Sequence, residues 1–119
     1  MRTLTISLMN STDALREMRE SAMRAWSTGD YQGESLSYAT PAQLFGIFTQ
    51  KRWEMIACLQ KQPAPISIRE LARQLGRDVH RVHDDVKVLL EEGVVEQDDA
   101  GISIPYAEIH TDFILKKAA

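Results

Sequence analysis

The sequence predicts a mainly α fold with a small β component, an α+β protein, on three observations. Apolar residues at helical spacing mark several short helices, each set off by helix-capping and helix-stopping residues. Alternating apolar and polar residues mark a strand near each end of the chain. In residues 66–106 two helices follow one another across a tight turn and lead into a strand pair. That order of elements is typical of a winged helix-turn-helix.

The composition favours a globular chain. Of the 119 residues 44% are hydrophobic, yet no stretch approaches the roughly 18 consecutive apolar residues of a membrane span. The N-terminus lacks the apolar core of a signal peptide, so we expect a cytoplasmic protein with no membrane partner. Its single cysteine cannot form an internal disulfide. The net charge of −3 argues against indiscriminate nucleic-acid binding, which needs an excess of positive surface.

The first residues predict a strand with one buried face. Leu4, Ile6 and Leu8 alternate with polar residues, which is the period of a half-buried strand. A lone strand is unstable and needs a partner. The candidates are residues 108–115, which also alternate, and the same strand of a second subunit.

A charge-rich amphipathic helix is expected from Asn10 or Ser11 to about Trp26. We interpret one side of it as packed and the other as solvated. The apolar stripe on the packed side consists of Leu15, Met18, Ala22 and Ala25. The connector that follows includes a short extended piece around residues 36–38.

Residues 40–119 are expected to form the winged helix-turn-helix domain, including a C-terminal strand. One helix begins after Thr40, and Thr49 caps the next, which spans residues 50–62. The apolar residues of this second helix lie on two faces, so both faces must be covered. One face should pack on the helix-turn-helix, and the other is free to pack on the N-terminal helices or on a second subunit. We therefore expect residues 1–39, the N-terminal strand and helix extension, to build a homodimer.

The helix-turn-helix is marked by its caps. Ser67 opens the first helix, with Glu70 placed to complete a capping box, and Gly76 can adopt the left-handed conformation that ends it. Asp78 caps the second helix, which Gly93 stops. The apolar stripe of the second helix consists of Val79, Val82, Val86, Leu89 and Leu90. Two amphipathic helices this close in sequence must cross steeply to share a core.

The outward side of the second helix carries the candidate DNA-reading residues. A helix fits the major groove, and an arginine can donate two hydrogen bonds to a guanine edge. The expected base readers are Arg77, His80 and Arg81, and the expected phosphate contacts are Arg69, Arg73 and Lys87. Asp84 belongs to the same side, where it could accept from a cytosine amino group but repels phosphate.

Two short extended stretches after Gly93, residues 94–97 and 102–106, predict a β-hairpin, the wing. The turn between them contains Asp98 and Asp99. Because carboxylates repel the phosphates of DNA, we expect this tip to contribute little to DNA binding.

The run "SIRELARQLGRDVHRVHDDVKVLLEEGVVE", with "FTQKRWEMIACL" before it and "PYAEIHTDFILKKAA" after it, resembles a group of small prokaryotic winged-helix proteins. These are described as DNA-binding transcriptional regulators, related in fold to the MarR and ArsR regulators and often suspected to be antitoxins of toxin–antitoxin pairs. The resemblance implies that an antitoxin of this kind would bind DNA as a dimer and a cognate toxin through another surface. Asp84 and Asp85 depart from the pattern, because a basic residue is expected there.

The main hypothesis is thus a dimeric, sequence-specific DNA-binding regulator that represses its own operon at a palindromic double-stranded operator. The rival is a winged-helix protein-interaction module that binds a partner protein and not DNA, which the acidic balance favours. We find no Gly-rich phosphate loop, nucleophile elbow or combined set of histidine, carboxylate and nucleophile in the sequence. We therefore expect neither an enzyme nor a cofactor.

Two weaker patterns in the sequence concern a metal and a small molecule. His80 and His83 have a spacing that can bind zinc, but two ligands do not make a site, so no metal is expected. Trp26, Tyr31 and Tyr38 could line a small-molecule pocket, although aromatic residues at such positions usually belong to the core.

Overall fold

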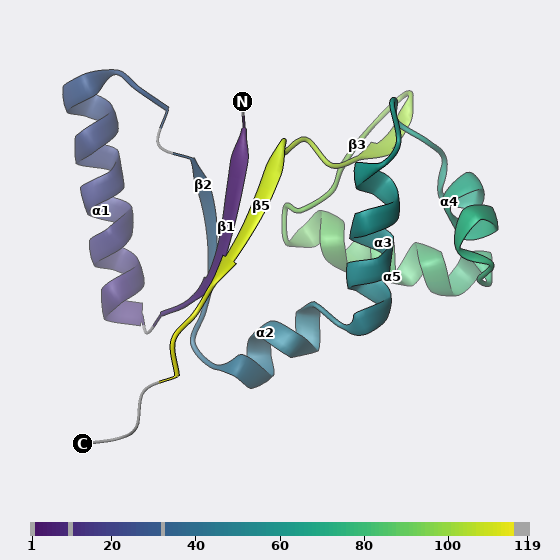
Figure 1. Ribbon diagram of the computed structural model, residues 1–119, viewed down its shortest axis with the longest axis horizontal. Helices are drawn as coiled ribbons and strands as arrows, with labels where there is room; N and C mark the ends of the chain where they lie inside the picture. Colours follow the sequence, from purple (N-terminus) through teal and green to yellow (C-terminus); the bar gives the residue numbers. More distant parts are fainter. Residues whose placement is uncertain (1, 10, 32, 116–119) are drawn as a thin grey trace. The chain divides into compact units, whose positions relative to one another are not determined.

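The computed structural model describes residues 2–9, 11–31 and 33–115 and shows an α+β protein (Figure 1). Within that part of the chain there are five helices and five strands. The chain divides into two compact units, one made of residues 1–45 and 106–119 and the other of residues 46–105. None of the helices in the described residues is both long enough and apolar enough to cross a membrane.

The first unit contains a three-stranded parallel sheet (Figure 1). Its central strand is β1 (Thr3–Leu8), which lies between β2 (Glu34–Tyr38) and β5 (Glu108–Asp112). Leu4 and Ile6 of β1 are buried, as the alternation predicted. The pairing of β1 with the C-terminal segment is also confirmed. This pairing places the C-terminal strand in the same unit as the N-terminal strand, whereas the sequence analysis assigned the C-terminal strand to the domain of residues 40–119.

A single helix, α1 (Ser11–Thr28), joins β1 to β2, because parallel neighbours need a crossover connection. Asn10, one of the two expected caps, lies outside the described residues. The helix ends at Gly29, where φ is 71° and the N–H donates to the Ala25 carbonyl at 2.8 Å.

The expected packed side of α1 is wrong in part, because its two largest residues face solvent: Leu15 is 63% exposed and Met18 68%. The described residues of α1 that are half-buried are Asp13, Ala14, Ser21 and Ala25. The residues that line a hollow of about 530 Å³ include Ala14, Met18, Ser21 and Ala25 of α1 and Thr5, Ser35 and Ser37 of the sheet. Since this sheet face carries hydroxyl groups, it offers little apolar surface for large side chains to bury against.

The next helix, α2 (Pro41–Ile47), begins with a reciprocal cap, as predicted. The Thr40 hydroxyl accepts from the Gln43 N–H at 3.2 Å, and the Gln43 side-chain oxygen accepts from the Ala39 N–H at 3.0 Å. In the first unit Phe45 of α2 meets Phe113 edge to face, with ring centroids 6.0 Å apart.

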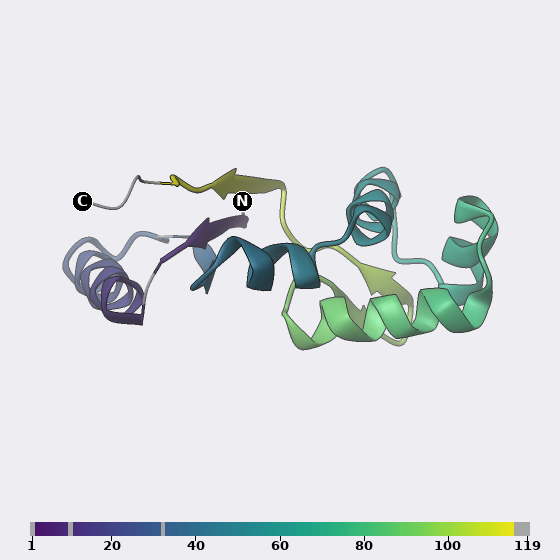
Figure 2. The ribbon, with the colours of Figure 1, turned by 90° about the horizontal axis from the view of Figure 1, so that it is seen from below.

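The second unit consists of three helices and a short hairpin. In order they are α3 (Gln50–Gln60), α4 (Ile68–Leu75), α5 (Val79–Glu91), β3 (Glu96–Asp98) and β4 (Gly101–Ser103). Figure 2 shows that α4 and α5 cross steeply, as the short turn between them requires. The side chains buried in this unit include those of Phe48, Met55, Leu71, Val82, Val86, Leu89, Val94 and Ile102.

A close backbone approach fixes where the hairpin lies. Ile66, before α4, exchanges two backbone hydrogen bonds with Ile102 of β4, at 2.8 and 3.1 Å. Gly101 has φ of 135°, and a Cβ there would lie 2.4 Å from the Ile66 carbonyl oxygen. Asp98 accepts from the N–H groups of Ala100 and Gly101, which closes the turn.

Candidate functional site

Three caps that the sequence predicted set the two ends of α4 and the start of α5. The Ser67 hydroxyl accepts from the Glu70 N–H at 3.0 Å, and Gly76 is left-handed with φ of 64°. The Asp78 carboxylate accepts from the Arg81 N–H at 3.2 Å. Only Gly76, Arg77 and Asp78 separate the two helices. The left-handed turn at Gly76 and the Asp78 cap therefore determine where α5 starts and which way it points.

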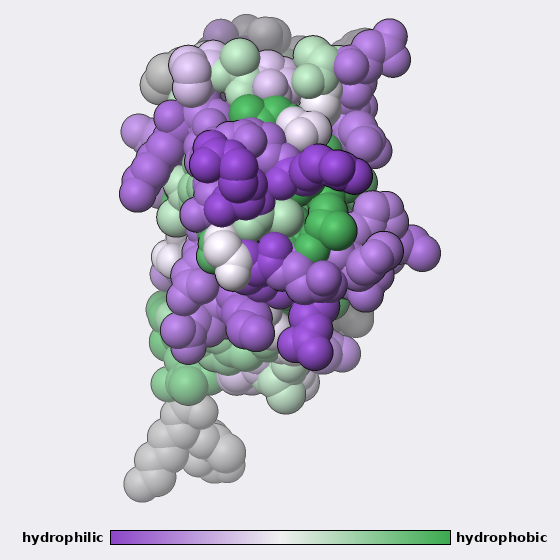
Figure 3. All heavy atoms as spheres, turned by 90° about the vertical axis from the view of Figure 1, so that its right-hand side faces the viewer, coloured by the Kyte–Doolittle hydropathy of each residue, from purple (hydrophilic) through white to green (hydrophobic). Residues whose placement is uncertain are grey.

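The helix α5 has one buried and one exposed side. Val82, Val86 and Leu89 are buried, as predicted, but Val79 in the first turn is exposed. The exposed row opposite the stripe consists of His80, Arg81, Asp84 and Lys87. Because all four side chains are exposed, the row is open to a charged partner. Figure 3 shows that the face of the second unit turned to the viewer is mostly hydrophilic, with smaller hydrophobic areas on it.

Arg77 does not belong to this exposed row, although the sequence analysis placed it there. Its side chain is only 16% exposed, and its Nη2 lies 2.7 Å from Oδ2 of Asp85. Its other terminal nitrogen, Nη1, is buried and has no hydrogen-bond partner among the described residues. The guanidinium is thus held inside the second unit, which opposes the expected role of Arg77 as a base reader.

Asp85 joins two helices of the unit through a second arginine. Arg52, in the first turn of α3, donates from Nε to Oδ1 of Asp85 at 3.1 Å. The same guanidinium donates from Nη1 to the carbonyls of Gly46 and Ile47, at 3.2 and 2.9 Å. We call Arg52, Arg77 and Asp85 the Asp85 cluster. It ties α3, the turn and α5 together. Its two guanidinium groups neutralise Asp85, which the sequence analysis noted only as a departure from the family pattern.

A groove of about 570 Å³ lies beside the Asp85 cluster, between the first turns of α3 and the N-terminal half of α5. Lys51 and Arg81 line it with exposed side chains. With Arg52 and Arg77 they bring four cations to the groove, against the carboxylates of Glu54, Asp84 and Asp85. The N-terminus of α3, capped by Thr49, adds its partial positive charge to the same place. The groove therefore favours an anion over a cation.

The two arginines of α4 are exposed but differ in their partners. Arg73 pairs with the Glu70 carboxylate, with Nε 2.9 Å from Oε2, and Arg69 is exposed on the same helix. The hydrogen bond from Arg73 lowers the pKa of Glu70 to about 2, helped by a hydrogen bond from Gln74. Glu70 in turn raises the pKa of Arg73. The charge of Arg73 is thus partly compensated before any partner binds.

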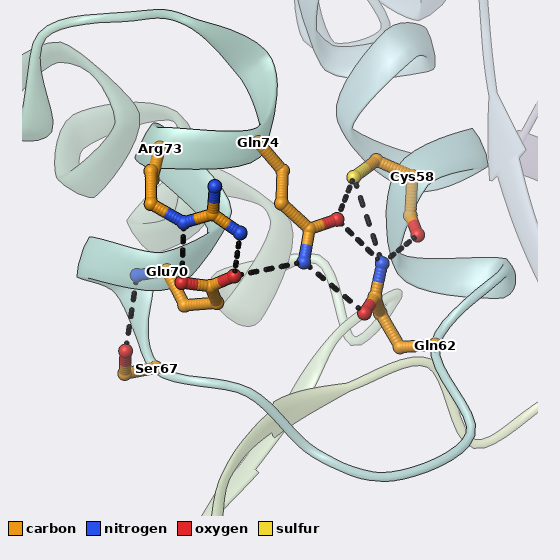
Figure 4. Close-up of polar contacts among 6 residues, drawn as sticks. All are labelled: Cys58, Gln62, Ser67, Glu70, Arg73 and Gln74. Atoms are coloured by element: carbon orange, nitrogen blue, oxygen red, sulfur yellow. Dashed lines mark hydrogen bonds and ion pairs between the residues drawn. The ribbon is translucent and has the colours of Figure 1, made fainter.

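The same carboxylate belongs to a polar network between α4 and the end of α3 (Figure 4). Gln74 donates to Glu70 and exchanges hydrogen bonds with Gln62, at 2.8 and 3.3 Å. Gln62 also donates to the Cys58 carbonyl at 3.0 Å. Glu70 was expected to reach back to Ser67 in a capping box. Its carboxylate instead accepts from Arg73 and Gln74, so only the Ser67 half of that prediction is confirmed.

Within the described residues no three side chains of histidine, cysteine, aspartate or glutamate gather as a metal site would require. His80 and His83 are both exposed on α5. The spacing that suggested zinc is thus not completed by a third ligand in that part of the chain.

Sequence reasoning missed the contribution of α3. Lys51 and Arg52 lie more than 25 positions before the exposed row, so no local pattern joined them to it. The position of Asp85 was the usable signal, since a carboxylate flanking a buried stripe needs a cationic partner from another element.

A family model, HVO_A0114, matches residues 47–111 of the chain, which is more than half of its length. The chain belongs to the HVO_A0114 family. No curated protein and no solved structure matches it.

The HVO_A0114 match spans α3, α4, α5 and the hairpin and reaches into β5. It therefore includes the exposed row of α5, the Asp85 cluster and the groove. The strand β1 and the helix α1 lie outside it.

Proposed function

We propose that the second unit is a winged helix-turn-helix that binds double-stranded DNA through α5, and that the protein is a cytoplasmic transcriptional regulator of its own operon. The observation that carries this proposal is the exposed row of α5, on a helix that follows a three-residue turn. Support for the winged form comes from the order of α3, α4, α5 and the antiparallel hairpin β3–β4.

In this proposal Arg81 and His80 contact base edges in the major groove. Both lie in the first turn of α5, which is the part of a recognition helix that usually reaches the bases. Arg81 is exposed, and its guanidinium forms no ion pair with a carboxylate in the part of the chain that the structure describes. Arg77 takes a different role: within the Asp85 cluster it supports the turn that presents Arg81.

Phosphate contacts would come from both sides of α5. Lys87 and Arg69 are exposed on α5 and α4. Lys51, in the groove, lies in the first turn of α3, where the helix N-terminus also favours a phosphate oxygen. Arg73 would contribute less than expected because Glu70 compensates its charge.

The acidic balance of the chain limits this proposal to specific binding. Asp84 lies in the exposed row, and Asp98 and Asp99 are exposed at the hairpin turn. These carboxylates repel phosphate wherever the fit is poor. A matched site is therefore expected to bind with steep salt dependence, while unrelated DNA binds weakly.

The test is fluorescence anisotropy on a fragment of the protein's own promoter, with a scrambled fragment beside it, over a range of salt concentrations. Arg81→Ala should weaken binding to the promoter by about 1–3 kcal/mol and reduce the preference over scrambled DNA. Arg16→Ala, which removes an exposed arginine from the first unit, is the matched control and should change neither. Promoter binding that Arg81→Ala leaves intact would contradict the contact assignment.

The second candidate is a protein-interaction module, which the net charge of −3 favours. It predicts no salt-dependent shift of any promoter fragment, together with co-purification of a neighbouring gene product. An antitoxin would combine both activities, with DNA on α5 and a cognate toxin elsewhere. Expression with and without the adjacent gene, followed by the same anisotropy assay, separates the three outcomes.

A further inference from the structure

A second hollow in the first unit lies where β1 and β5 end. Its volume is about 530 Å³, which is within the usual range for a small-molecule site. The last residues of β1, residues 112–115 and the first turn of α1 contribute to its lining. Figure 1 shows that the two strands run in the same direction and that α1 begins close to the end at which they stop. Ligands of open parallel sheets usually bind outside the carboxyl ends of the strands. We call this site the Asp112 hollow.

A buried serine in the Asp112 hollow lacks a hydrogen-bond partner. Ser7 is only 8% exposed, and its hydroxyl forms no hydrogen bond with any residue that the structure describes. It lines the hollow. Leaving a buried hydroxyl without a partner costs free energy. A polar atom of a ligand in the hollow would supply the missing partner, since a serine hydroxyl can both donate and accept.

Two carboxylates make the Asp112 hollow acidic. Asp112 is the register partner of Ser7, so the two side chains leave the same face of the sheet. Asp112 is exposed and forms no ion pair within the described part of the chain. Asp13, in the first turn of α1, also lines the hollow, and Arg16 compensates part of its charge at 2.9 Å. None of the described residues that line the hollow is a cation.

The chain that follows β5 adds an apolar wall. Ile114 is 72% exposed, Leu115 70% and Phe113 38%, and all three residues line the hollow. The Phe113 ring is held edge to face against Phe45, so part of the wall has a fixed position. An apolar group placed in the hollow would cover these side chains and remove their surface from water, which is favourable.

We propose that the Asp112 hollow binds a small organic amine, whose ammonium group lies between Asp112 and Ser7 and whose apolar body lies against residues 113–115. An ammonium carries three donors, so it can donate to the Asp112 carboxylate and to the Ser7 hydroxyl at once. The inference goes beyond the proposed function and does not rest on it. Every described residue that lines the hollow belongs to the first unit and lies outside the family match.

The charge balance of the hollow decides for a cation. Both α1 and α2 begin beside the hollow, and the N-terminus of a helix favours an anion with about half an elementary charge. Asp13 offsets this effect in α1, and the Thr40 and Gln43 caps use N–H groups at the start of α2. The full charge of Asp112 is left without compensation among the described residues.

Titration of the full chain with three probes of similar size tests the charge that the hollow prefers. Phenethylamine is a cation at neutral pH, phenethyl alcohol is neutral and phenylacetate is an anion. NMR of the isotope-labelled protein should give a dissociation constant of about 1 mM or below for the amine, with shifts of the Ser7 and Asp112 amide signals. The alcohol should bind about tenfold more weakly, and the anion more weakly still. Added salt should weaken binding of the amine but not of the alcohol.

Two variants locate the site. Asp112→Asn should weaken binding of phenethylamine about tenfold and leave binding of phenethyl alcohol unchanged. Ser7→Ala should weaken binding of phenethylamine by about threefold to tenfold, through loss of one hydrogen bond. Glu108→Gln is the matched control, since it removes one carboxylate from the same face of β5 at the other end of the strand, and it should change neither. Circular dichroism of all variants checks that they remain folded.

The outcomes that would overturn the proposal are distinct. Phenethyl alcohol or phenylacetate that binds as tightly as phenethylamine would show that the hollow does not select a cation. Absence of amine binding at millimolar concentration, or amine binding that Asp112→Asn leaves intact, would remove the site. No DNA enters these measurements, so the proposed function can fail without changing their result.

Discussion

Removal of the Asp85 carboxylate is the sharpest perturbation of the second unit. Asp85 accepts from Arg77 at 2.7 Å and from Arg52 at 3.1 Å, and the three side chains are only 16–18% exposed. Asp85→Ala leaves two guanidinium groups facing one another without the charge that separates them. Breaking a fully buried pair costs about 3–5 kcal/mol. Since these groups keep some contact with water, we expect about 3 kcal/mol.

The matched control is the preceding residue. Asp84 is exposed and lines the same groove, and it forms no ion pair with a residue that the structure describes. Asp84→Ala should change the free energy of unfolding by less than about 0.5 kcal/mol. Both variants remove one carboxylate from α5, so they shift the net charge and the helix propensity alike.

Urea denaturation followed by circular dichroism measures the difference between the two variants. Asp85→Ala should also lower the Tm by about 10 °C, given the size of the chain. Equal stability of the two variants would refute the reasoning, because the Asp85 cluster would then not hold α3, the turn and α5 together. Asp85→Asn should fall between them, since the amide keeps one acceptor oxygen but loses the charge.

Three further outcomes are expected. Gly101→Ala should destabilise the protein by about 2–4 kcal/mol in urea denaturation, since its Cβ would lie 2.4 Å from the Ile66 carbonyl oxygen at a φ of 135°. The lowered pKa of Glu70 means that its contribution to stability is present above its ordinary pKa of 4.5 and is lost as the pH falls toward 2. Carboxyl NMR should give a pKa near 2 for Glu70 that rises in Arg73→Ala, and an unchanged value would contradict the pairing. Lys51→Ala should reduce the salt slope of promoter binding by about 0.9 at unchanged sequence preference, and an unaltered slope would remove the groove from the phosphate contacts.

Local signals predicted most of the secondary structure. Thr40, Thr49, Ser67 and Asp78 each accept the hydrogen bond expected of a cap, and Gly76 is left-handed. A cap depends on residues two or three positions apart, so its physics is contained in a short stretch of chain. The first strand of the hairpin begins at Glu96 and not at Val94 as expected, because the N–H groups of Val94 and Val95 donate to the Leu89 carbonyl at 3.0 and 3.3 Å.

The candidate site was predictable only where a side chain's surroundings come from its own helix. His80, Arg81, Asp84 and Lys87 are exposed because the buried stripe of α5 takes the opposite side, and helical spacing alone determines that division. Arg77 was misplaced because its partner, Asp85, is held in turn by Arg52, which lies 33 residues away from Asp85 in the sequence.

The sequence by itself determined the helices, their caps, the alternating strand β1 and the exposed side of α5, since each follows from neighbours within one or two turns of chain. Only the tertiary structure decided the parallel sheet β2–β1–β5, the confinement of Arg77 and the exposure of Leu15 and Met18 on α1. Those features depend on which surfaces meet. An amphipathic pattern shows that an apolar side can be covered, and only the packing of distant segments shows whether the chain covers it.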